Sequence, residues 1–151
     1  MPSRSTDPSD DPGTPEAPAR RLRADAQRNT AAVLEAAKSV FVESGVDAPV
    51  REIAARAGVG VGTLYRHYPQ RSDLIVAVFQ TEVDACAAAA SALKDEYPPG
   101  EALAKWLHRY VDFFATKRGL ADALHSGDPA YAALPAYFED RLQPAIGALL
   151  E

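Results

Sequence analysis

Residues 49–69 constrain the fold most, because their glycines and prolines leave room for only two short helices. Apolar positions at helical spacing predict these helices over about 49–57 and 63–68, each closed by a glycine or proline. Gly60 and Gly62 permit backbone conformations closed to other residues, so we expect a tight turn over the residues between the helices. Two short helices joined by such a turn are typical of a helix-turn-helix unit.

Longer amphipathic segments flank this unit. Before it, apolar residues three and four apart predict a helix that begins near Arg20 and ends at Gly45. After it, Ser72 is a candidate cap for a long fourth helix, whose apolar line is Ile75, Phe79, Val83, Cys86, Ala90 and Leu93. A fifth helix ends at Gly119, a short one follows, and a last one runs to the C-terminus. No segment alternates with period two, so the predicted fold class is all-α.

Charge is segregated along the chain, although the net charge is only −5. Residues 1–19 are acidic and rich in proline, and we expect a disordered tail. Residues 20–73 hold nine Lys or Arg against six Asp or Glu, whereas residues 74–151 hold six against eleven. A basic block between two acidic ones favours an anionic partner at residues 20–73.

Several classes of protein are not expected. The three histidines are far apart, no serine or cysteine has a nucleophile signature, and no lysine follows Gly62 to make a phosphate loop. We therefore expect no enzyme activity, no cofactor and no metal site. The sequence has no secretory signal or membrane span, and its one cysteine, Cys86, cannot form an internal disulfide. These features predict a cytoplasmic protein without a membrane partner.

The sequence from Val50 to Pro69, VREIAARAGVGVGTLYRHYP, followed by Arg71, resembles the DNA-binding domain of the TetR/AcrR family of transcriptional regulators. The resemblance covers about residues 24–79 and is looser beyond them. It implies a three-helix helix-turn-helix domain (20–73), which a long fourth helix joins to a partial ligand-binding and dimerisation domain (74–151). It also implies a repressor that binds a palindromic double-stranded DNA operator as a homodimer and leaves it when a small-molecule inducer binds.

The resemblance assigns DNA contacts to Arg51, Val61, Gly62, Thr63, Tyr65, Arg66, His67 and Arg71. In that assignment Val61, Gly62 and Thr63 face base edges, Tyr65 and His67 donate to the DNA backbone, and the arginines reach bases or phosphates. Each of these side chains could instead make no DNA contact: Thr63 could cap its helix, and an arginine could be an ordinary solvated charge. Leu64 is expected in the core. Arg20, Arg21 and Arg23 form either a DNA-contacting arm or a plain charged leader.

Two positions depart from the family pattern. Pro49 and Gly60 stand where members often have hydroxyl residues that cap a helix or contact phosphate. Each missing contact is expected to weaken DNA binding by about 1 kcal/mol.

The sequence indicates the functional residues of the second domain less clearly. Trp106, Tyr110, Phe113 and His125 are candidates to line an apolar ligand cavity, together with Phe114 and Tyr131. The alternative is plain helical core, which we expect for the stripe Leu103, Leu107, Tyr110 and Phe114. The family usually continues with two long dimerisation helices, so the chain resembles either a fragment or a shortened member. A different function, a helical protein-interaction module with secondary DNA binding, stays open.

Overall fold

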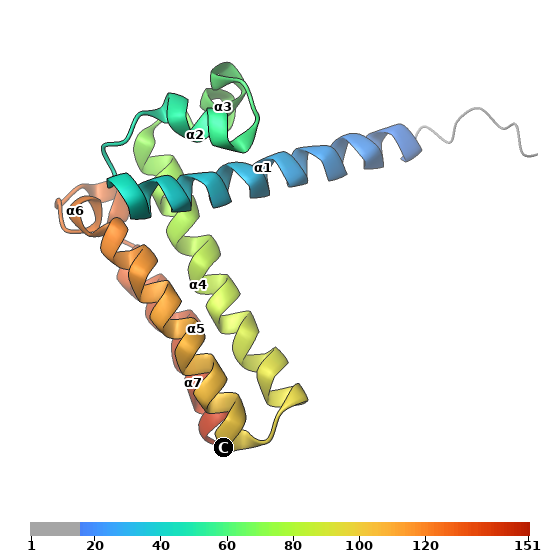
Figure 1. Ribbon diagram of the computed structural model, residues 1–151, viewed down its shortest axis with the longest axis vertical. Helices are drawn as coiled ribbons and strands as arrows, with labels where there is room; N and C mark the ends of the chain where they lie inside the picture. The colour runs from blue at the N-terminus through green and yellow to red at the C-terminus, as the bar shows by residue number, and fades with distance from the viewer. Residues whose placement is uncertain (1–15) are drawn as a thin grey trace, which may run out of the picture.

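The structure, a computed structural model, describes residues 16–151, which form seven α-helices and one short 3-10 helix (Figure 1). The elements in chain order are α1 (Glu16–Ser44), α2 (Val50–Ala57), α3 (Val61–His67), α4 (Arg71–Glu96), α5 (Pro99–Gly119), α6 (Ala121–Leu124), the 3-10 helix η1 (Pro129–Tyr131) and α7 (Leu134–Leu150). None of these residues lies in a strand. The predicted all-α fold is confirmed.

The helix-turn-helix unit is built on α1, against which α2 and α3 pack. Ile53 of α2 and Leu64 of α3 are fully buried, as expected for the apolar faces of two short amphipathic helices. Gly45 and Gly58 end α1 and α2 with φ angles of 84° and 73°. This left-handed conformation favours glycine, so the predicted stops at both positions are confirmed.

Three local predictions were wrong. The turn before α3 does not use the special freedom of Gly60 and Gly62: Gly60 is extended, with φ −71°, and Gly62 lies inside the helix, which begins two residues early. Gln70, not Ser72, precedes the first residue of α4, and its backbone N–H donates to the Asp73 carboxylate at 3.0 Å.

The start of α1 also differs from the expected boundary. The helix begins at Glu16 rather than near Arg20, so the last residues of the expected tail 1–19 are helical. Pro18 fits there, because first-turn N–H groups have no partner within a helix and proline has no N–H to lose. Residues 1–15 lie outside the described part of the chain.

The second half of the chain is a bundle of α4, α5 and α7, which run lengthwise together while α1 crosses near their upper ends (Figure 1). The buried residues of α4 include Ile75, Phe79, Val83, Cys86 and Ala90, which confirms most of its predicted apolar line. By length and composition alone α4 could cross a membrane. Its apolar residues are buried against α1, α5 and α7, which is the environment of a core helix.

The buried face of α5 is only partly the predicted one, because Leu103 and Tyr110 of the expected stripe are half-buried against the core. Ala102, Trp106, Phe113 and Thr116 are buried, whereas Leu107 and Phe114 of the expected core stripe are 49% and 44% exposed. The two faces differ by about 100°, the rotation between successive helical residues. On the observed face Trp106 of α5 donates its indole N–H to the Cys86 carbonyl of α4 at 2.9 Å.

α1 packs on α4 and α5, and two of its contacts with them are specific. At Gly119 the end of α5 lies so close to α1 that an added Cβ would be 2.9 Å from the Phe41 carbonyl oxygen and from the Val42 Cα. Farther along, the buried Glu82 of α4 lies between two cations, 3.3 Å from Lys38 of α1 and 3.8 Å from Arg109 of α5. A buried carboxylate needs such partners to offset its lost hydration.

Candidate nucleic-acid interface

One buried side chain, that of Leu64, determines which residues of α3 are exposed. Leu64 is 1% exposed and is the one residue of α3 in the hydrophobic core, which fixes the rotation of this seven-residue helix. Val61, Gly62, Tyr65, Arg66 and His67 are consequently exposed, with Tyr65 at 49%, and Thr63 is half-buried. The structure therefore brings six of the eight predicted DNA contacts onto one short helix.

Gly62 leaves open space at the start of this surface. A Cβ added there would meet no atom within 4 Å, so packing within the chain does not require glycine at this position. The absence of a side chain keeps the beginning of α3 flat, which would allow its backbone to approach another surface closely.

The remaining two predicted contacts, Arg51 and Arg71, lie at the starts of α2 and α4 and have different environments. Arg51 is exposed. Arg71 is half-buried, and its Nη1 donates to the carbonyl oxygens of Val46 and Ala48 at 2.8 and 2.6 Å. Sequence analysis missed this structural role, by which the first residue of α4 holds the loop before α2.

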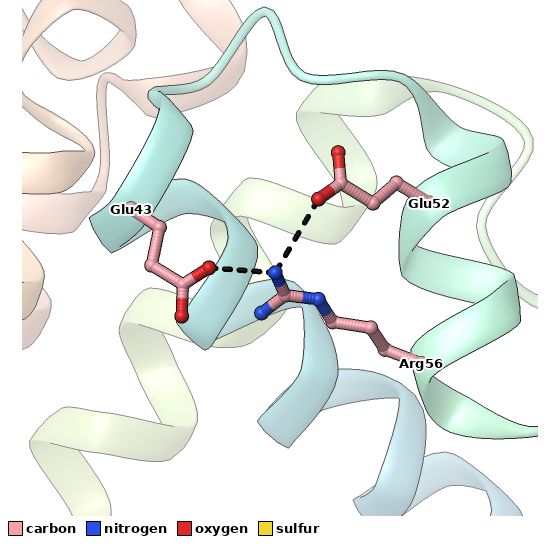
Figure 2. Close-up of polar contacts among 3 residues, drawn as sticks. All are labelled: Glu43, Glu52 and Arg56. Atoms are coloured by element: carbon pink, nitrogen blue, oxygen red, sulfur yellow. Dashed lines mark hydrogen bonds and ion pairs between the residues drawn. The ribbon is translucent and has the colours of Figure 1, made fainter.

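A salt bridge braces α2 against the end of α1 (Figure 2). Arg56 Nη2 lies 2.6 Å from Glu43 Oε2 of α1 and 3.4 Å from Glu52 Oε1 of its own helix. The hydrogen bond from Arg56 lowers the pKa of Glu43 below its ordinary value, and the same bond raises the pKa of Arg56. The spacing of Glu52 and Arg56 by four residues could have indicated the contact within α2, whereas no local spacing indicates the contact with Glu43 of α1.

A cavity of about 260 Å³ lies in the second half, between α4, α5, α6, η1 and α7. Its lining residues are Phe79, Lys117, Leu124, His125, Tyr131, Leu134, Pro135, Phe138 and Glu139. Burial raises the pKa of Tyr131, so its hydroxyl stays neutral over the physiological range. The described residues contain no group of three or more His, Cys, Asp and Glu side chains that could hold a metal ion.

Of the six residues expected to line a ligand cavity, the structure places His125 and Tyr131 on this one. Trp106 and Phe113 are buried in the core, and Tyr110 stacks on Trp106 with ring centroids 5.3 Å apart. Sequence analysis missed Phe79, Lys117 and Phe138, which come from three different helices and share no local pattern.

The sequence and the fold of this chain are similar to those of known proteins. A family model described as "Bacterial regulatory proteins, tetR family" matches residues 33–78, the segment from the middle of α1 to the beginning of α4. A TetR transcription regulatory protein from Mycobacterium vanbaalenii is 40% identical in sequence, with a TM-score of 0.72, and the match covers 85% of this chain and 80% of that one. The chain belongs to the TetR family.

Other TetR-family proteins are similar over shorter parts. The TetR-like regulator LfrR from Mycobacterium smegmatis, solved in complex with proflavine, is 30% identical with a TM-score of 0.57, over 81% of this chain and 70% of that one. A helix-turn-helix transcriptional regulator from Staphylococcus aureus is 31% identical over 109 residues, which are 71% of this chain and 59% of the relative. The chain thus spans about three fifths of the length of this curated relative.

Proposed function

We propose that this TetR-family chain is a cytoplasmic transcriptional repressor that binds a palindromic DNA operator as a homodimer and releases it when a small molecule binds. The observation that carries DNA binding is the exposed face of α3. Buried Leu64 holds the helix from behind while polar and small residues cover its outer side. A helix supported in this way fits the major groove, which is about 12 Å wide.

Different residues of this face are suited to different parts of DNA. Val61, Thr63 and Arg66 lie at positions from which side chains would reach base edges, where donor, acceptor and methyl groups distinguish the base pairs. Tyr65, His67 and Arg51 are exposed donors suited to phosphate oxygens. Arg71 already donates to two carbonyls through Nη1, so it would offer phosphate its remaining N–H groups.

Release by a small molecule is supported by the position of the cavity. Phe79 lines it from α4, two turns after Arg71, which holds the loop before α2. A ligand that displaces this part of α4 would therefore act on the helix-turn-helix unit. Known ligand pockets measure roughly 300 to 1,000 Å³, so a cavity of about 260 Å³ favours a molecule of one or two rings. The proflavine complex of LfrR shows that a relative holds a flat aromatic molecule.

A binding selection from a random pool of duplex DNA, repeated at two salt concentrations, tests the proposal. Enrichment of a palindrome is the expected result, because a two-fold symmetric dimer reads two related half-sites. Replacing Val61, Thr63 or Arg66 by alanine should then relax the enriched sequence, whereas His67→Ala should weaken binding to all sequences alike. Salt-sensitive binding without enrichment would contradict operator recognition by a dimer, and no binding at either salt would contradict DNA binding itself.

A specific observation favours a second candidate, a protein-interaction module. Leu107, Val111 and Phe114 of α5 are 49%, 65% and 44% exposed and lie on one side of the helix. Neighbouring exposed apolar side chains of this kind often mark a protein contact. In that case the chain would keep its biological activity after substitution of Tyr65, which a DNA-binding repressor would lose.

A further inference from the structure

The N-terminal part of α1 extends beyond the rest of the fold. Figure 1 shows this part of the helix projecting past α2, α3 and the bundle. Every residue from 19 to 29 is exposed, and even Leu22, on the side that continues the buried face of α1, is 70% exposed. Packing against the body therefore does not explain why the helix continues here.

This projecting part is strongly basic. Arg20, Arg21, Arg23 and Arg28 lie within nine residues, whereas Asp25 is the one acid among residues 19–28. Asp25 pairs with Arg28 at 2.7 Å, while the described contact of Arg23 is a hydrogen bond from Nε to the Ala19 carbonyl of its own helix. With 100° between successive residues, every direction around the helix lies within about 100° of Arg20, Arg21 or Arg23.

The C-terminal end of the basic segment lies beside α3. Asn29 and Thr30 of α1 line a shallow hollow together with Thr63 and His67, which are two of the predicted DNA contacts. Arg20 precedes Asn29 by nine residues, a distance along the helix of about 14 Å. That length is comparable to the major-groove width of about 12 Å, so the segment is long enough to reach the phosphates that border the groove.

We infer that residues 19–28, here called the basic arm, form a helical DNA-binding element that contacts phosphates beside the segment bound by α3. The inference rests on the proposed DNA binding and adds a second contact region to it. The partner is the phosphate backbone, because guanidinium groups bind phosphate oxygens in pairs and four of the ten residues of the arm are exposed arginines. Its contribution is therefore independent of base sequence.

A charge-matched pair of variants tests the arm. The double variant R21A/R23A removes two arm charges and keeps a strong helix former at both positions. The control K94A/K105A removes two exposed charges, one in the last turn of α4 and one in the first half of α5, and the junction of these helices lies far from α3 in Figure 1. Binding of each variant to a duplex of fixed scrambled sequence, about three helical turns long, is measured by fluorescence anisotropy between about 50 and 200 mM salt.

We expect R21A/R23A to bind the duplex roughly tenfold more weakly at the lower salt and to reduce the slope of log K against log salt by about 2. The affinity and the slope of K94A/K105A should stay near those of the unmodified chain. A slope equal to that of the control variant would overturn the arm and leave DNA binding by α3 in place. If the unmodified chain does not bind the duplex, both the arm and the proposed function fall.

A third variant tests whether the helix itself matters. Ala24→Pro keeps all four arginines but interrupts the helix among exposed residues, so the urea midpoint of the folded core should not change. We expect its affinity to fall toward that of R21A/R23A. Unmodified affinity would show that loose charges suffice and would overturn a helical arm.

Discussion

Helices α3 and α5 use their side chains in opposite ways. α3 has one fully buried apolar residue, Leu64, and its exposed residues Tyr65, Arg66 and His67 are polar or amphipathic. α5 buries Trp106 and Phe113 and still exposes apolar side chains along a neighbouring face. The comparison teaches that a helix with few apolar residues has its orientation fixed by its sequence, whereas a helix that is apolar over more than half of its circumference can be oriented only by its neighbours.

The largest expected effect tests the orientation of α5 with two adjacent phenylalanines. Phe113 is 1% exposed, so Phe113→Ala should lower the free energy of unfolding by about 3 to 5 kcal/mol. Phe114 is 44% exposed, so Phe114→Ala should cost about 1 kcal/mol or less. Urea denaturation of both variants measures the difference. An equal or larger loss for Phe114→Ala would show that the predicted stripe, not the observed face, is the buried one.

The next effect separates support from contact on α3. Leu64→Ala should cost about 2 to 5 kcal/mol of stability, because it leaves a cavity behind the helix. Tyr65→Ala should change stability by about 0.5 kcal/mol or less and yet weaken binding to duplex DNA of any sequence roughly tenfold. Denaturation and anisotropy on the same samples distinguish the two. DNA affinity that survives Tyr65→Ala would contradict the proposed docking of α3.

The smallest effect concerns the brace between α1 and α2. Because Arg56 lowers the pKa of Glu43 below its ordinary value of 4.5, the ion pair stabilises the fold above that value and loses its contribution as the pH falls through the lowered pKa. Glu43→Gln should therefore reduce the urea midpoint of unfolding slightly at neutral pH. At strongly acid pH it should not, because protonated Glu43 is then as neutral as the glutamine that replaces it. A deficit of equal size at both pH values would mean that the Glu43 charge does not contribute. Both partners are solvent-exposed, which keeps the effect small.

The sequence predicted the helix-turn-helix half well because its determinants are local. Gly45 and Gly58 end helices through a backbone conformation that glycine favours, and Leu64, which was expected in the core, is 1% exposed. The turn itself was misread, since Gly60 and Gly62 adopt conformations that other residues share. A glycine in the sequence therefore does not by itself predict a left-handed backbone: Gly45 and Gly58 have a positive φ, whereas Gly60 and Gly62 do not.

The rest could not be predicted because it depends on contacts between distant segments. The bonds from Arg71 reach carbonyls 25 and 23 residues earlier in the chain, and the cavity collects residues from four helices and η1. On α5 the choice of buried face depends on which side fits α4, which no spacing within α5 encodes. The predicted DNA contacts on α3 and the predicted ligand residues stay predictions, although the structure shows which of them share a surface.

The close approach at Gly119 sets a limit on how this chain can vary. An exposed residue of α3 can change identity without moving its neighbours, and a regulator can thereby acquire a new target sequence. At residue 119 even one methyl group would collide with the backbone of α1. Backbone cannot rotate away as a side chain can, so a substitution there would have to push the two halves of the protein apart. Residue 119 is thus a constrained position even though it has no side chain.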